Sequence, residues 1–134
     1  MTSNAQAKSG AGRTIARGYR DLLVWQKGIA LVKEVYILTR GFPDEERFGF
    51  ISQMRRAAVS IPSNIAEGQA RRTTGEFVQF LSHAEGSLAE LDTQMRVSTE
   101  LGFCGGPMAA YAASIEQLAE ELRRMLNSLR RKLE

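Results

Sequence analysis

The residues best suited to catalysis are few and scattered in this chain. His83 is the only histidine and Cys104 is the only cysteine. A thiol and an imidazole can act as nucleophile and base, but that pair needs a third group to orient the imidazole, and the sequence offers none. The di-iron motif Glu-x-x-His is missing, because Phe80 stands three residues before His83. The P-loop, G-x-G-x-x-G and zinc-ligand spacings are absent too, so we expect no enzyme activity, no cofactor and no metal site.

Basic residues form the second group with chemical potential, because clustered arginine and lysine can bind phosphates. The candidate contacts for RNA or DNA are Arg13, Arg17, Arg20, Arg71, Arg72, Arg123, Arg124, Arg130, Arg131 and Lys132. A structural alternative for Arg123 and Arg124 is pairing with Glu120 on a solvated helix face. Aromatic residues do not alternate with these charges, which argues against sequence-specific binding of single strands.

The composition describes one domain of ordinary character. The chain has 134 residues, of which 43% are hydrophobic and 25% charged, with a net charge of +3. The lone cysteine excludes an internal disulfide, and no apolar run is long enough to cross a membrane, so we expect a cytoplasmic protein. Residues 1–18 are predicted to be a flexible basic N-terminal tail, either a nucleic-acid-binding arm or a solvated tail, and residues 19–134 a folded domain.

Helical periodicity predicts four helices in that domain, at about residues 21–40, 44–68, 73–101 and from 107 almost to the C-terminus. Asp21 is a candidate N-cap of the first helix, and Thr73-x-x-Glu76 is a capping box that opens the third. The predicted core stripes are Leu22, Trp25, Ile29, Val32 and Tyr36; Ile51, Met54, Ala58, Ile61 and Ile65; Phe77, Leu81, Ala84, Leu88, Leu91 and Met95; and Tyr111, Ile115, Leu118, Leu122, Met125 and Leu129. Since no strand pattern occurs and the links are short, the fold class is all-α, an antiparallel up-down four-helix bundle.

A proline inside the second predicted helix is the most distinctive local feature. Pro62 has no N–H to donate to the carbonyl of Ala58, so it favours a kink in this helix. Polar residues around it could bond the freed backbone, form an intersubunit salt-bridge network with Glu90 or Glu76, or bind a ligand, and the structural roles are favoured. The residues of the kink and its polar network are Arg55, Arg56, Ser60, Pro62, Ser63, Asn64, Glu67 and Glu90.

Two helices carry more apolar or small surface than one core uses, which favours a homo-oligomer. The predicted interface lies opposite the core stripes of the first and third helices. It comprises Val24, Leu31, Val35, Leu38, Ser82, Gly86, Ala89 and Thr93. The alternative is that these residues widen the core within one chain.

Several of these elements together resemble a known family. They are Tyr19-Arg20-Asp21-Leu22 with Trp25, Phe42-Pro43 with Glu46, the proline-centred run from Gln53 to Gly68, Arg71, Phe77, Phe80-Leu81 and the run from Gly86 to Leu91. The chain resembles the bacterial 23S rRNA intervening-sequence proteins over about residues 19–133. That resemblance implies a four-helix up-down bundle that assembles into a ring, a homopentamer, and binds RNA or DNA without strong sequence specificity.

The same family is similar in fold to accessory proteins of diversity-generating retroelements, which are basic pentamers that bind a reverse transcriptase and nucleic acid. This chain departs from them in its nearly balanced charge. The alternative function is therefore a structural adaptor that binds a protein partner, such as a reverse transcriptase or another nucleic-acid enzyme.

Overall fold

The chain folds into four long helices, and the part that the structure describes contains no strand. The computed structural model describes residues 18–134. Its helices are α1 (Leu23–Thr39), α2 (Ser52–Gln69), α3 (Thr74–Glu100) and α4 (Ala109–Leu133). Short 3₁₀ turns cover Tyr19–Asp21, Asp44–Glu46 and Gly106–Met108, and a π turn covers Arg47–Ile51. The all-α prediction is confirmed.

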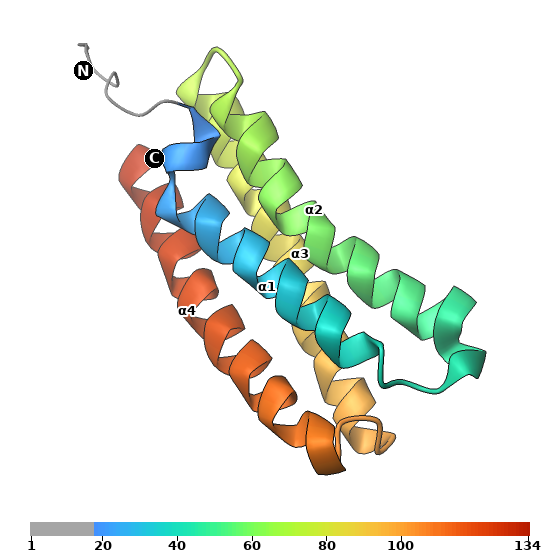
Figure 1. Ribbon diagram of the computed structural model, residues 1–134. Helices are drawn as coiled ribbons and strands as arrows, with labels where there is room; N and C mark the ends of the chain where they lie inside the picture. Colours follow the sequence, from blue (N-terminus) through green and yellow to red (C-terminus); the bar gives the residue numbers. More distant parts are fainter. Residues whose placement is uncertain (1–17) are drawn as a thin grey trace.

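The four helices lie side by side, and each packs against two others (Figure 1). α1 packs against α2 and α4, and α3 also packs against α2 and α4. The α1–α2 side and the α3–α4 side are therefore opposite sides of the molecule. The start of α1 lies beside the end of α4, where Leu22 and Leu23 share a hollow with Leu129 and Lys132.

The helix boundaries follow the local capping chemistry. Thr73 caps α3 as predicted, because its Oγ1 accepts a hydrogen bond of 3.1 Å from the backbone N–H of Glu76. Asp21 does not cap α1. It lies inside the preceding 3₁₀ turn, and the extended Leu22 is the N-cap, whose carbonyl accepts from the N–H groups of Trp25 and Gln26 at 3.1 Å.

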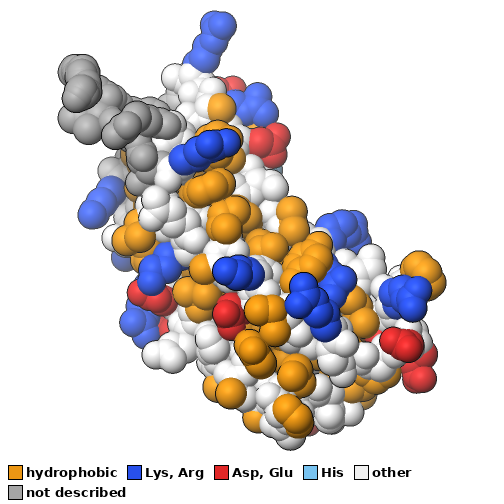
Figure 2. Space-filling model, in the orientation of Figure 1, with side chains coloured by type: hydrophobic (Ala, Val, Ile, Leu, Met, Phe, Trp, Pro, Cys, Tyr) orange, Lys and Arg blue, Asp and Glu red, His pale blue; other side chains and the backbone are white. Residues whose placement is uncertain are grey.

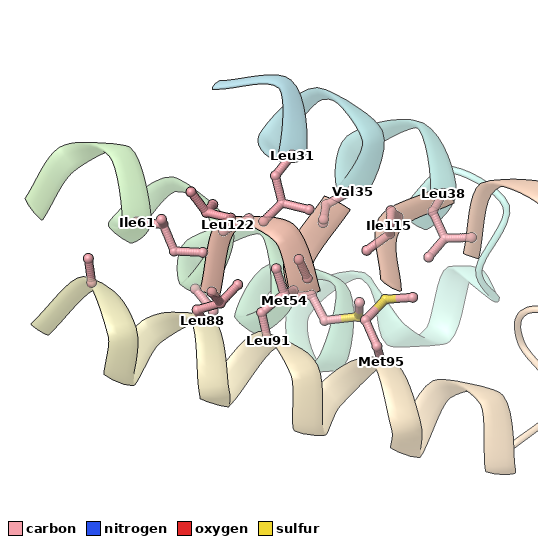
Figure 3. Packing of buried hydrophobic residues seen from close by; sticks show 14 of the residues in the cluster. Leu31, Val35, Leu38, Met54, Ile61, Leu88, Leu91, Met95, Ile115 and Leu122 are labelled. Atoms are coloured by element: carbon pink, nitrogen blue, oxygen red, sulfur yellow. The ribbon is translucent and has the colours of Figure 1, made fainter. Parts of the chain in front are cut away.

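The core stripes predicted for α2 and α3 are confirmed. Ile51, Met54, Ala58, Ile61 and Ile65 from α2 and its preceding π turn are buried, and so are Phe77, Leu81, Ala84, Leu88, Leu91 and Met95 from α3. Figure 3 shows Met54 and Ile61 directed towards Leu88, Leu91 and Met95 in the interior. Each fully buried large side chain contributes roughly 1.5–3 kcal/mol relative to leaving it in water.

The core stripe predicted for α1 is wrong, and so is the α1 half of the predicted oligomer interface. Val24, Leu31, Val35 and Leu38 are at most 5% exposed and belong to the core of the single chain. Their steps of seven, four and three residues, with Gly28 between, form a narrow heptad seam that fits between α2 and α4. Trp25, Ile29, Val32 and Tyr36 flank this seam and stay partly or largely accessible.

The stripe of α4 is also rotated from its predicted position. Ile115 and Leu122 are buried as expected, but small Ala112 and Ala119 and the larger Leu126 complete the buried row. Tyr111 is 37% exposed, and Leu118, Met125 and Leu129 only border the core. Alanine carries little weight in an apolar pattern, so the pattern alone favoured its larger neighbours.

Two glycines allow close approaches that position α2. Pro62 is buried within α2 and faces Gly28 of α1, where an added Cβ would lie 3.3 Å from the Cβ of Pro62. Near the C-terminal end of α2, a Cβ on Gly68 would lie 2.7 Å from the Cβ of Phe80 and 2.9 Å from the ring of Phe77. The backbones of α2 and α3 therefore meet at Gly68 with no room for a side chain.

We expect Gly68→Ala to lower the free energy of unfolding by about 1–2 kcal/mol, because overpacking outweighs the gain in helix propensity. Gly86→Ala is the matched control, since Gly86 is also helical and has no atom within 4 Å of the added Cβ. The control should be neutral or stabilising. Urea unfolding followed by circular dichroism checks both, and equal midpoints for the two variants would contradict the close contact at Gly68.

Candidate nucleic-acid interface

Three segments that are far apart in the sequence bring basic side chains to one end of the molecule. The segments are the turn before α1, the α2–α3 connection and the end of α4 (Figure 1). A hollow of about 240 Å³ joins them, lined by Leu22, Arg71, Arg72 and Leu133 among others. We call this surface the basic end. It comprises Arg20, Arg71, Arg72, Arg130, Arg131 and Lys132.

Two arginines of the basic end are held by partners within the chain. Arg130 donates from Nε to Glu85 at 2.6 Å and from a terminal nitrogen to Glu134 at 2.9 Å. The hydrogen bond to Glu85, with a smaller contribution from Glu134, raises the pKa of Arg130 above its usual value. Arg71 lies over the ring of Phe80, 4.8 Å from its centroid, and 3.9 Å from a carboxylate oxygen of Glu67. Both side chains are therefore already oriented.

The other charges of this end are available to an outside partner. Among the side chains that the structure describes, no carboxylate lies within 4.0 Å of Arg72, Arg131 or Lys132, and all three residues are exposed. An anion that meets them displaces water and counterions without breaking an existing ion pair. The accessible positive charge of this end thus includes Arg72, Arg131 and Lys132, and Arg20 is exposed as well.

A second basic surface continues from this end along α4. Arg131 and Lys132 share a shallow hollow of about 450 Å³ with Arg123, Arg124 and Asn127. Arg123 and Arg124 are both paired with Glu120, through Nε hydrogen bonds of 3.0 and 3.2 Å. Arg123, followed by Arg124, holds the pKa of the Glu120 carboxyl below its usual range, and Glu120 in turn raises the pKa of Arg123. The two arginines together exceed the one acid, so this hollow keeps a positive charge.

Comparison with known families identifies the chain. A family model described as 23S rRNA-intervening sequence protein matches residues 20–128. The chain belongs to this family. A comparison with curated proteins gives no match. The matched range includes the proline-centred run of α2 and both arginines of the α2–α3 connection.

The polar residues around Pro62 form two separate groups rather than one network. Asn64 donates from Nδ2 to the carbonyl of Ser60 at 2.8 Å and to its hydroxyl at 3.0 Å, and the Ser60 hydroxyl lies 2.9 Å from that of Ser87 in α3. This group joins α2 to α3 beside the proline. Ser60 and Asn64 therefore bond each other, but the carbonyl that Asn64 reaches is that of Ser60 and not the carbonyl of Ala58 that Pro62 frees.

Arg55 forms the second group, with α1. Its Nε donates to the hydroxyl of the buried Thr39 at 2.9 Å, and its guanidinium lies over the ring of Tyr36, 4.3 Å from the centroid. Sequence reasoning missed Thr39, because nothing in the spacing connects residue 39 with residue 55.

The remaining residues of the predicted network do not meet around Pro62. Glu67 is near Arg71, and Glu90 accepts a hydrogen bond of 3.3 Å from Gln94. Arg56 and Ser63 are exposed.

The other predicted sites have mixed positions. On α3, Ser82, Gly86, Ala89 and Thr93 share an exposed face, so their role in an interface stays a prediction. Arg13 and Arg17 lie outside the described residues.

His83 is exposed on α3 with its ring edge-on to Phe80, whereas Cys104 is buried in the α3–α4 connection, and burial raises the pKa of its thiol. In residues 18–134, no three histidine, cysteine or acidic side chains are grouped as a metal site would need.

The partners of Arg130 predict a difference between neighbouring arginines. Arg130→Gln should lower the urea midpoint of unfolding, because Glu85 loses its charged partner at a half-buried position where both side chains are only 22–23% exposed. Arg131→Gln, the matched control on the exposed side of the same turn, should leave the midpoint within error. Equal losses in the two variants would contradict a stabilising role for the Arg130–Glu85 pair.

Proposed function

We propose that this protein is a non-catalytic, cytoplasmic homo-oligomer that binds RNA or DNA through the basic end, without strong sequence specificity. In this proposal each chain is an antiparallel up-down bundle bent at Pro62, and five chains form a ring. The convergence of three distant basic segments at one end of the molecule is the observation that carries the proposal.

The chemistry of the basic end supports binding to phosphates rather than to bases. Arg72, Arg131 and Lys132 are exposed charges with no carboxylate within 4.0 Å in the described part of the chain. Phe77, the aromatic residue that lines the same hollow, is buried in the core and offers no ring for stacking. Contacts of this kind read charge and backbone spacing, which every nucleic acid shares.

Repetition compensates for the modest charge of one chain. The net charge is only +3, and several of the arginines are paired within the chain. A ring presents several basic ends to one polyanion, so that binding at one end raises the effective concentration of the others.

Exposed apolar side chains support the assembly itself. Leu23, Ile29 and Leu101 are 57%, 43% and 58% exposed. Figure 2 shows hydrophobic side chains running along the face that carries α1, between scattered basic ones. Neighbouring copies in an oligomer would cover such side chains. Among the described helices, none is both long and apolar enough to be a membrane span.

The oligomer has a direct test. One chain has a mass of 14.9 kDa, and native mass spectrometry at low micromolar concentration should give five times this mass. A well-folded monomer under these conditions would contradict the assembly, and another multiple would correct the number of subunits.

Binding should depend steeply on salt. We expect a structured RNA to be retarded near 50 mM salt, with the logarithm of the affinity falling linearly against the logarithm of salt concentration. Replacing Arg72, Arg131 and Lys132 by Gln should reduce the magnitude of this slope by about two or more. The matched control replaces Lys33, Arg40 and Arg96 by Gln, an equal loss of exposed charge away from the basic end.

Electrophoretic mobility shift across a salt series measures these slopes. Absence of binding even at about 50 mM salt, where electrostatic contacts are strongest, would reject the nucleic-acid function and leave the protein adaptor as the function to pursue. Equal slopes for the two triple variants would move the contact away from the basic end.

A further inference from the structure

A groove between α1 and α2 combines exposed apolar surface with arginine. It has a volume of about 630 Å³ and is lined by Tyr36, Arg47, Phe48, Arg55, Arg56 and Val59, among others. Phe48 is 90% exposed and Val59 41% exposed. We call this feature the α1–α2 groove. A phenylalanine so fully in water, above an apolar floor, indicates a surface that another molecule covers.

The arginines of the α1–α2 groove have no acidic partner among the described residues. No carboxylate among the described side chains lies within 4.0 Å of Arg47, Arg55 or Arg56. Arg55 is fixed by Thr39 and the Tyr36 ring, and Arg47 lies 5.6 Å from the centroid of the Phe48 ring. The groove therefore suits a partner with carboxylates that can pair with the arginines and with small side chains against which Phe48 can pack.

The opposite side of the same molecule has these properties. A hollow of about 240 Å³ between α3 and α4 is lined by four acids and one base, together with small residues that include Ala89 and Thr93. The acids are Glu85, Asp92, Glu116 and Glu120, and the base is Arg123. Glu85 and Glu120 are already paired with arginines, whereas no basic group of the described residues lies within 4.0 Å of Asp92 or Glu116. The small side chains of Ala89 and Thr93 leave room for a close approach. We call this surface the α3–α4 face.

We propose that the α1–α2 groove of one copy receives the α3–α4 face of the next copy. Phe48 then covers the small residues Ala89 and Thr93, while Arg47 and Arg56 meet Asp92 and Glu116. This inference rests on the homo-oligomer proposed above and specifies its contact. The two surfaces lie on opposite sides of each chain, so the association is head-to-tail, and its repetition closes into a ring when the rotation between neighbours permits.

The groove suits a second copy better than a nucleic acid. Its floor is apolar, with Ile51 and Val59, and it is separate from the basic end. The same chain also carries two acids, Asp92 and Glu116, for the two arginines Arg47 and Arg56. Opposite charges across the contact would set the register between copies and disfavour other pairings.

Two variants test the contact separately. The groove variant carries Arg47→Gln, Phe48→Ser and Arg56→Gln, and all three residues are exposed in the single chain, so folding should persist. Arg55 is left unchanged because it holds Thr39. The face variant carries Asp92→Arg and Glu116→Arg, which are exposed as well. Arg40→Glu, a charge reversal outside both surfaces, is the control.

Native mass spectrometry at low micromolar concentration should show the groove variant and the face variant as monomers. Both should keep the helical circular dichroism of the wild type. The Arg40→Glu control should keep the mass of the wild-type oligomer. Mixing the two variants in equal amounts should give a dimer of one chain of each, because only one intact groove and one intact face remain to pair. Formation of this dimer separates head-to-tail contact from a symmetric one, in which groove meets groove.

Three results would overturn the inference. If the groove variant keeps the mass of the wild-type oligomer, the contact between copies lies elsewhere. If this variant keeps that mass and no longer retards RNA, the groove binds nucleic acid. If both variants are monomers but do not pair on mixing, the contact is not head-to-tail. A wild-type protein that is itself a monomer would reject the oligomer of the proposed function, and this inference with it.

Discussion

The position of α2 between α1 and α3 is the constraint on which the rest of the structure depends. Two glycines set it, since Gly28 lets Pro62 approach α1 and Gly68 lets the backbone of α2 meet Phe80 of α3. With α2 held at both places, the α2–α3 connection reaches the end of α4 and brings Arg72 to the basic end. The same placement leaves the first turns of α2 beside Tyr36 and opens the α1–α2 groove.

Pairing within the chain decides which charges can act outside it. Arg130 precedes Arg131 in the sequence but is bound to Glu85. Arg71 precedes Arg72 but lies over the ring of Phe80 and near Glu67. Their neighbours point to solvent. A row of arginines in the sequence therefore divides into residues that stabilise the fold and residues that are available for a ligand. For Arg130 and Arg131 in α4, helical geometry makes this division, because successive residues of a helix are about 100° apart.

Much of the fold could be predicted from the sequence, and the errors have physical causes. The stripes of α2 and α3 were correct because large aliphatic residues repeat there on one side only. On α1 two apolar stripes compete, and the heptad seam through Val24 and Leu38 is buried although the flanking row contains the larger Trp25 and Tyr36. On α4 the alanines at 112 and 119 pack more tightly than their larger neighbours. Both outcomes depend on the shape of the space between helices, which a one-dimensional pattern does not contain.

The candidate site was predictable in its residue types but not in its arrangement. The arginine clusters near residues 71 and 131 were recognised, but their meeting at one end, and the grouping of Arg47, Phe48 and Arg55 with Tyr36, needed the packed helices.

The neighbouring positions of Leu22 and Leu133 have a practical consequence for protein engineering. Leu133 lines the same hollow as Arg72, so a fluorescent protein or purification handle joined after α4 would be delivered next to the basic end. The α3–α4 connection lies at the other end, where Gly102 and Gly106 have positive φ angles of 83° and 58° in exposed turns. A reporter inserted between the exposed Gly105 and Gly106, beyond the buried Cys104, would leave the basic end unobstructed.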